Sequence, residues 1–195
     1  MSKIEKYMKI LSERIKIFYE RINSNESLDS LVTEIDDLLK INKNSLPLLL
    51  IKGICYFKLK KYDECEKTFK HSLEIYPNDI NILSNYGVFL INLSRYEESK
   101  NIYKSLIQLQ PKNQSFLNNL GISYFYLGEL DISLTIFSKA LEINDYDHNS
   151  LINYANSLME LGLLGNAEIY YKKSLSVNQR SYLALYNLWI ISKKN

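Results

Sequence analysis

The chain repeats itself at one fixed spacing, and this period constrains the fold more than any other feature of the sequence. One column at this spacing holds only small residues: Gly53, Gly87, Gly121 and Ala155. A second column is aromatic: Phe69, Tyr103, Phe137 and Tyr171. A third is again small: Cys65, Ser99, Ser133 and Ala167. Self-similarity at a constant spacing indicates a protein in which one supersecondary unit stacks on the next.

Inside each unit the apolar residues follow helical spacing. In the third unit, Leu117, Leu120 and Tyr124 fall on one helical face, and Leu130, Leu134 and Phe137 continue on a second helix. Gly128 and Glu129 supply the short turn between the two helices. The small columns let the paired helices approach closely, while the aromatic column fills the space between successive hairpins. The pattern therefore predicts an all-α stack of helical hairpins.

The motif in each unit resembles that of the tetratricopeptide repeat family, Trp-x2-Leu-Gly-x2-Tyr, then Ala-x3-Phe, then Pro. The third unit matches as Leu117-x2-Leu120-Gly121-x2-Tyr124, followed by Ser133-x3-Phe137. The resemblance implies an α-α superhelix with four repeats over residues 46–179, in the phases 46–79, 80–113, 114–147 and 148–181. Residues 1–45 are predicted to form a degenerate N-terminal helical hairpin, and residues 180–195 a C-terminal capping helix.

Composition and charge disfavour several classes of protein. The chain has 24 Lys and Arg against 22 Asp and Glu, a net charge of +2, which disfavours a protein that binds nucleic-acid phosphates. No apolar run reaches the ~18 residues needed to cross a bilayer, and the first residues lack the apolar core of a secretory signal. We therefore expect no membrane insertion and a cytoplasmic location. Two cysteines are too few for a disulfide framework.

The family resemblance also implies a binding face, since the first helices of tetratricopeptide hairpins line a concave groove that holds peptides. At the sixth position of each phase stand Ile51, Asn85, Asn119 and Asn153. A side-chain amide can pair with both the C=O and the N–H of a peptide backbone. The predicted groove residues are Asn81, Ser84, Asn85, Asn92, Asn118, Asn119, Phe125, Tyr126, Asn153 and Asn156. The alternative is that Asn at the sixth position is simply the usual family residue.

In the first repeat the groove positions are apolar instead of polar: Leu50, Ile51, Ile54 and Phe57. An exposed patch of this kind often marks a partner site. Alternatively, the N-terminal hairpin folds over the patch and buries it. Chaperone-binding members of the family hold a terminal carboxylate with a clamp of Lys, Asn and Arg. Here the candidate basic positions are Leu50, Ser115 and Asn119, so we do not expect recognition of a chaperone tail.

Three function hypotheses follow. The first is a non-catalytic adaptor or assembly factor that holds an extended protein or peptide segment in the Asn-lined groove. The second is a self-associating scaffold that forms a homodimer through the apolar patch or the N-terminal hairpin. The third, a regulatory repeat domain of an enzyme complex, is the least favoured. The sequence contains no phosphate loop or nucleophile elbow, and the stretch from Asp145 to Asn156 lacks the Gly and Glu of a calcium loop. We therefore expect no enzyme activity, no cofactor and no metal.

Overall fold

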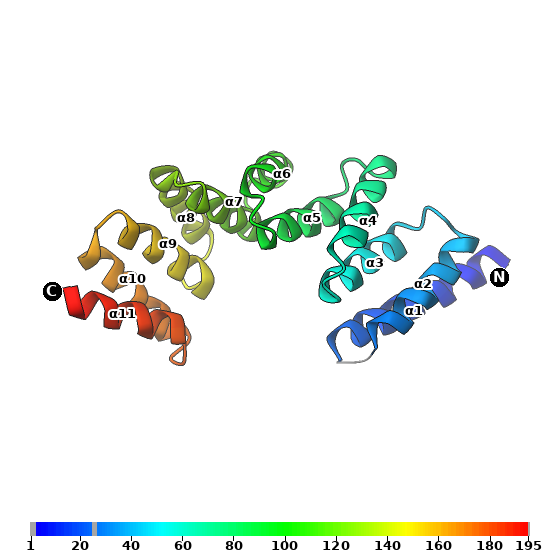
Figure 1. Cartoon of the computed structure of the whole chain (residues 1–195), viewed down its shortest axis with the longest axis horizontal. Helices are drawn as coiled ribbons and strands as arrows, with labels where there is room; N and C mark the ends of the chain where they lie inside the picture. Colours follow the sequence, from blue (N-terminus) through cyan, green and yellow to red (C-terminus); the bar gives the residue numbers. More distant parts are fainter. Residues whose placement is uncertain (1–2, 25–26, 195) are drawn as a thin grey trace. The chain divides into compact units, whose positions relative to one another are not determined.

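The computed structural model describes residues 3–24 and 27–194, and every regular element in these ranges is an α-helix (Figure 1). The helices are α1 (Lys3–Asn23), α2 (Leu28–Ile41), α3 (Leu46–Lys58), α4 (Tyr62–Ile75), α5 (Ile80–Asn92), α6 (Tyr96–Leu109), α7 (Gln114–Tyr126), α8 (Leu130–Ile143), α9 (His148–Glu160), α10 (Leu164–Val177) and α11 (Tyr182–Lys194). From α3 onwards, each first helix begins one repeat period after the previous one.

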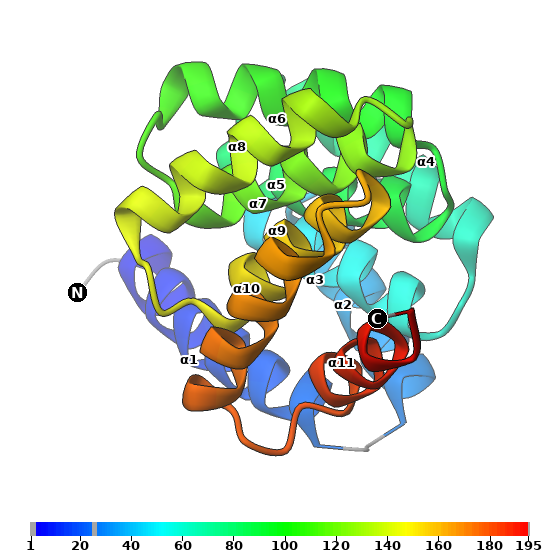
Figure 2. The ribbon, with the colours of Figure 1, turned by 90° about the vertical axis from the view of Figure 1, so that its left-hand side faces the viewer.

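The chain divides into two compact units, residues 1–86 and 87–195, and the boundary falls within α5. In the first unit, α2 packs on α3 and α3 on α4. In the second unit, α7 packs on α8, α9 on α10, and α11 on α10. Figures 1 and 2 both show α9, α10 and α11 side by side. In both units, these helices bury one face against a helix that is their neighbour in the chain.

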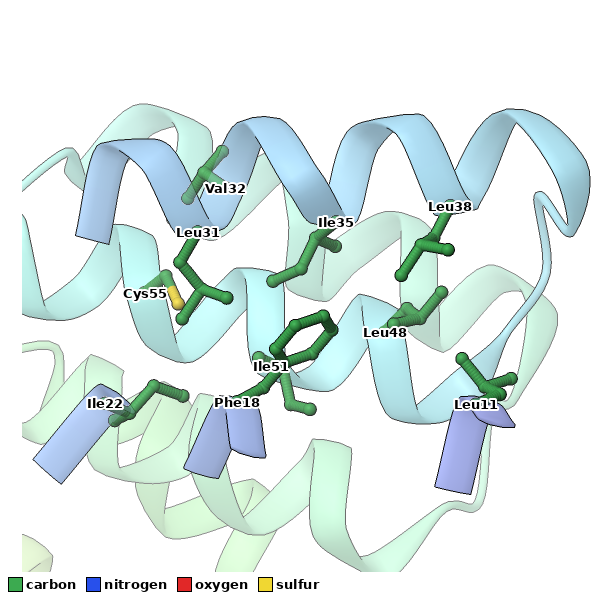
Figure 3. Close-up of a cluster of buried hydrophobic side chains, with 10 residues drawn as sticks. All are labelled: Leu11, Phe18, Ile22, Leu31, Val32, Ile35, Leu38, Leu48, Ile51 and Cys55. Carbon is green, nitrogen blue, oxygen red and sulfur yellow. The ribbon is translucent and has the colours of Figure 1, made fainter. Parts of the chain in front are cut away.

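The first unit has an apolar core to which three helices contribute. Phe18 from α1, Leu31 and Ile35 from α2, and Ile51 from α3 are all buried in one cluster, which Figure 3 shows. Fully burying side chains of this size contributes about 1.5–3 kcal/mol each. The N-terminal hairpin is therefore held on α3 by the same apolar packing that joins the repeats.

The small column of the first helices lies directly under the aromatic column of the second helices. A Cβ atom added to Gly121 would lie 2.5 Å from the Phe137 ring, and one added to Gly53 would lie 2.7 Å from the Phe69 ring. Carbon atoms prefer a separation of about 3.5–4.0 Å. The glycines therefore leave the space that each ring occupies.

The other small column supplies hydrogen-bond donors that the sequence analysis did not identify. Its side chains donate to the backbone carbonyl of the facing glycine in three successive hairpins. The bonds are Cys65 Sγ to Gly53 O (3.4 Å), Ser99 Oγ to Gly87 O (3.3 Å) and Ser133 Oγ to Gly121 O (3.0 Å). In the second unit, Ser123 Oγ also donates to Ser99 Oγ over 3.1 Å, so buried hydroxyls connect one hairpin to the next. Buried polar atoms are thereby satisfied.

The loops repeat as well. The turn between the two helices of a hairpin requires a residue with positive φ, which Gly128 and Gly162 provide at φ 77°. At the same phase, Lys60 and Ser94 adopt φ 58°. Between hairpins, the side chains of Asp79, Asn113 and Asp147 accept hydrogen bonds from backbone N–H groups at the next helix start. These caps satisfy amides that the helix itself leaves unpaired.

Candidate peptide-binding groove

The groove predicted from the sequence lies along the first helices, and in the second unit its amides bond to one another and to buried phenols. Asn119 on α7 donates from Nδ2 to the Tyr103 hydroxyl over 3.0 Å. Asn153 on α9 donates from Nδ2 to Oδ1 of Asn118 over 3.1 Å. Both asparagines are partly buried. The Asn118–Asn153 bond joins α7 directly to α9, so two first helices form one polar face.

A third amide continues this pattern on α11. Asn187 is buried and donates from Nδ2 to the Tyr171 hydroxyl over 2.9 Å and to Asn156 Oδ1 over 3.1 Å. Tyr171 in turn donates to Asn156 Oδ1 over 2.6 Å. Burial raises the pKa of Tyr171 to about 12, so its hydroxyl keeps its proton at neutral pH. The three side chains form a closed hydrogen-bonded cluster.

The aromatic column explains which partner is bonded by each asparagine at the sixth position of its phase. Where the preceding second helix carries a tyrosine, Tyr103 or Tyr171, the following amide donates to its hydroxyl. Where it carries Phe137, which has no hydroxyl, Asn153 bonds to Asn118 instead. Sequence reasoning identified the asparagines but missed these phenols. The alternation of Phe and Tyr in the aromatic column was the signal that could have revealed them.

The internal bonds leave part of each amide unused. Among the described residues, Asn118 and Asn156 accept through Oδ1, but neither donates a hydrogen bond from Nδ2. Asn119 and Asn153 show the opposite pattern, because each donates from Nδ2 while its Oδ1 accepts nothing. The polar face therefore offers both donors and acceptors. An extended peptide backbone presents the complementary groups.

Two hollows lie on this face. The first measures about 240 Å³ and is lined by residues with polar side chains, which are Gln114, Ser115, Asn118, Asn119, Asp147 and Asn149. The second measures about 30 Å³, and its lining is Ile122, Phe125, Tyr126, Phe137, Asn153 and Asn156. The structure thus brings the predicted aromatic anchors Phe125 and Tyr126 together with the predicted amides Asn153 and Asn156.

The predicted aromatic anchors differ in exposure. Tyr126 is exposed and stacks on Tyr96, with ring centroids 4.7 Å apart. Phe125 is partly buried and meets the Tyr126 ring edge-on at 5.3 Å. Because Tyr126 is held from behind by Tyr96, its outer ring face is presented in a defined orientation. Rigid aromatic rings of this kind commonly anchor a partner side chain.

The remaining predicted groove residues lie on α5. Asn81 is exposed, Ser84 is partly buried, and both belong to the first unit with Asn85. Asn85 donates from Nδ2 to the Asn81 carbonyl of its own helix over 2.8 Å. Asn92 belongs to the second unit and donates in the same way to the Val88 carbonyl. These amides bond locally, unlike the cross-helix bonds made by Asn119 and Asn153.

The apolar patch predicted in the first repeat is not an exposed surface. Leu50 and Ile51 are buried, and Ile51 lies in the cluster with Phe18 of α1 (Figure 3). Ile54 packs against the same cluster, and Phe57 is partly buried. The prediction of an accessible patch is therefore wrong for Leu50 and Ile51, which are both buried, and around Ile51 the N-terminal helices supply the apolar side chains that cover it. The alternative interpretation, in which the N-terminal hairpin folds over the patch, describes the structure.

Two further properties concern the described residues as a whole. Within residues 9–24 and 27–194, no group of three or more His, Cys, Asp or Glu side chains is arranged to hold a metal ion. Of the helices that the structure describes, none combines the length and hydrophobicity needed to span a bilayer.

The fold defines the class as an all-α repeat protein built of helical hairpins, in which α7 and α9 of the second unit share a polar face. The family model of the Psidin N-terminal tetratricopeptide repeat region matches residues 12–131, and a tetratricopeptide repeat model matches residues 148–181. The chain belongs to the tetratricopeptide repeat family. Among curated protein sequences, none matches the chain.

Several solved structures have a similar fold. PilW, described as a widely conserved type IV pilus biogenesis factor, has a TM-score of 0.85 and 23% identity, with 94% of this chain and 85% of that chain covered. YrrB, described as a TPR protein with an unusual peptide-binding site, has a TM-score of 0.74 and 17% identity, with 100% of this chain and 99% of that chain covered. The first TPR of Spaghetti (RPAP3), bound to an HSP90 peptide, has a TM-score of 0.57 and 19% identity, with 59% of this chain and 91% of that chain covered. At these identities the likeness concerns the fold.

Proposed function

We propose that this chain is a non-catalytic adaptor that binds an extended segment of another protein along α7 and α9. The observation that carries the proposal is the unused hydrogen-bonding capacity on this face. Within the part of the chain that the structure describes, Asn118 and Asn156 keep free amide donors, and Asn119 and Asn153 keep free carbonyl acceptors. Bonds to these groups would hold a peptide backbone while reading few of its side chains.

The aromatic pair at the end of α7 would supply what specificity the segment needs. Phe125 and Tyr126 share a small hollow with Asn153 and Asn156. An apolar or aromatic side chain of the bound segment would pack on these rings while the neighbouring backbone bonds to the amides. Burial of one aromatic contact of this kind contributes about 0.5–1.5 kcal/mol beyond its area.

Two neighbours of similar fold bind peptides according to their descriptions, which supports a peptide ligand here. The candidate clamp positions Leu50, Ser115 and Asn119 carry no Lys or Arg, and Leu50 is buried. A terminal carboxylate would find no cation at these positions. We therefore propose an internal extended segment as ligand, in contrast to the acidic end of a chaperone.

The test begins with a library of random peptides displayed on phage and selected against the purified chain. A recovered peptide is synthesised and titrated by calorimetry. The combined variant Asn119→Ala and Asn153→Ala is expected to weaken binding by about tenfold or more, because each lost hydrogen bond is worth about 0.5–1.5 kcal/mol. Unchanged affinity would remove these two amides from the mechanism.

Both asparagines also make internal bonds, so two controls separate binding from folding. Tyr103→Phe removes the hydroxyl that Asn119 bonds but leaves the groove amides in place, and it should retain most of the affinity. Asn101→Ala makes the same Asn-to-Ala change on an exposed position of α6 and should have no effect. If Asn101→Ala weakens binding as much as the groove variant does, the groove is not the site.

A further inference from the structure

The outer face of α11 carries a stripe of exposed aromatic and aliphatic residues. Exposure reaches 79% for Tyr182, 49% for Leu185, 47% for Tyr186 and 57% for Trp189. Tyr186 stacks on Tyr182 and on Trp189, with ring centroids 6.2 Å and 6.1 Å apart. The opposite face of α11, with Ala184 and Ile191, is buried. Such contiguous exposed apolar surface is typical of interaction sites.

The repeat phase shows what normally covers these positions. Leu185 stands one repeat period after Leu151, which is fully buried, and two periods after Leu117, which is 4% exposed. In those repeats the second helix of the same hairpin packs on the first, α8 on α7 and α10 on α9. The exposed face of α11 is therefore the face that a second helix covers elsewhere in the chain.

Trp189 excludes a second helix placed as in the other hairpins. It stands one repeat period after Ala155, in the column that Gly121 also occupies. At Gly121 even a single added Cβ atom would lie 2.5 Å from the Phe137 ring of the second helix. An indole at this phase would fill the space of that ring. A helix that covers α11 must therefore lie differently and present small side chains opposite Trp189.

Charge distinguishes between the possible occupants. The segment from Asn178 to Asn195 contains the basic residues Arg180, Lys193 and Lys194 and no acidic residue. The three cations are exposed and lie at the two ends of the apolar stripe. If two copies of α11 paired, parallel or antiparallel, cations would face cations, which disfavours that pairing. An occupant with carboxylates at its ends would be attracted.

We propose that the outer face of α11 is a docking surface for an amphipathic helix of a partner protein. Its apolar side, bearing small residues, covers Leu185 and Trp189, and Asp or Glu residues at its ends meet Arg180, Lys193 and Lys194. This is helix-on-helix recognition, in which apolar anchors recur at helical spacing. It is distinct from the extended segment proposed for the amide groove.

The sequence contains a single tryptophan, so fluorescence reports on this surface alone. Two synthetic helical peptides serve as probes, with identical Ala and Leu faces but either Glu or Lys at both ends. The Glu-ended peptide is expected to shift Trp189 emission to the blue and to bind about tenfold more tightly than the Lys-ended one at low salt. Added salt should reduce this difference. Equal binding of both peptides, or no shift with either, would overturn the proposal.

Dye-labelled peptide followed by fluorescence anisotropy extends the test to variants. Trp189→Ala and Leu185→Ala should each weaken binding by about tenfold, since buried anchors dominate helix docking. Leu109→Ala removes an equally exposed leucine from α6 and should leave binding unchanged. The combined Asn119→Ala and Asn153→Ala variant should also bind normally, and a loss there would place the peptide in the groove.

Self-association is the remaining outcome. Analytical ultracentrifugation without peptide should show a monomer, and the emission of Trp189 at the same protein concentrations should be that of a solvent-exposed indole. A concentration-dependent dimer with blue-shifted emission, abolished by Trp189→Ala, would identify a second copy as the occupant and refute the partner-helix proposal. Circular dichroism of each variant checks that the helices remain folded, which is expected for the changes at Leu109, Leu185 and Trp189 because those side chains are exposed.

Discussion

The two ends of the repeat array treat an apolar helix face in opposite ways. Near the start, α1 and α2 pack on α3, so Ile51 is buried against Phe18 (Figure 3). At the other end, α11 buries one face on α10 and leaves Leu185 and Trp189 open to solvent. Both α3 and α11 carry an apolar face in their sequence. Whether such a face forms a core or an interaction surface depends on what packs against it.

The residue at the small column is part of the difference. In α3 this position is Gly53, and the ring of Phe69 lies directly over it. In α11 the same phase holds Trp189, which fills that space itself. The residue in this one column thus decides whether the second helix of a tetratricopeptide hairpin can pack on the first. The comparison suggests three tests, ordered by expected effect.

The largest effect is expected from Phe18→Ala, which removes a buried ring from the first-unit core. Such truncations cost about 3–5 kcal/mol. Cys55 is buried in the same cluster, so its reaction with a thiol reagent in urea reports on this end, while Trp189 fluorescence reports on the other. The urea midpoint of labelling should fall. The fluorescence midpoint should move much less, since repeat proteins transmit stability mainly to neighbouring repeats.

The matched control for this prediction is Ile17→Ala, which removes an aliphatic side chain that is half exposed on the same helix. Its effect should stay within about 0.5 kcal/mol. If Phe18→Ala lowers both midpoints equally, the two ends unfold as one cooperative body, and the contrast between them does not extend to stability.

The second prediction concerns the small column. Gly121→Ala places a methyl group 2.5 Å from the Phe137 ring. Overpacking costs about 1–3 kcal/mol, which exceeds the helix-propensity gain of about 1 kcal/mol. The same change at Gly165, whose added Cβ atom would meet nothing within 4 Å, should instead stabilise the protein by up to about 1 kcal/mol. Urea unfolding followed by Trp189 fluorescence measures the stability of both variants. If Gly121→Ala and Gly165→Ala change the free energy of unfolding in the same direction, the packing argument is refuted.

The third effect is the smallest at neutral pH, because it appears only in alkaline solution. Burial raises the pKa of Cys55 from its ordinary 9.0 to about 11 and that of Cys65 to about 12. Between about pH 9 and pH 12, the two thiols lose their protons in the unfolded chain but keep them in the folded chain. The free energy of unfolding should therefore be constant below about pH 9 and fall as the pH rises towards 12.

Cys65→Ser provides the control for the alkaline prediction, because Ser99 and Ser133 occupy the same column in other repeats. The variant should fold and should lose less stability between pH 9 and pH 12 than the parent chain. Urea midpoints from circular dichroism at several pH values give the comparison. Identical pH profiles would show that the Cys65 thiol does not contribute.

Much of the hairpin geometry follows from the sequence because the repeat forces each position into a recurring environment. The two small columns face each other as expected, with Ser133 bonded to the Gly121 carbonyl, but the aromatic column also packs inside the hairpin, where the Phe137 ring lies over Gly121. The groove was less predictable. Asn119 and Asn153 occupy equivalent positions in the repeat, yet one bonds to Tyr103 and the other to Asn118. That choice depends on a neighbour supplied by another helix, which spacing alone does not reveal.

By itself, the sequence determined that the chain is a stack of helical hairpins, because a fixed period of small and aromatic columns is satisfied by that packing. Only the tertiary structure decided which apolar faces are covered. It places Ile51 inside a core and Trp189 on a surface, although both lie on apolar first helices. The reason is physical: exposure depends on the side chains of other helices, and periodicity describes only the helix to which a residue belongs.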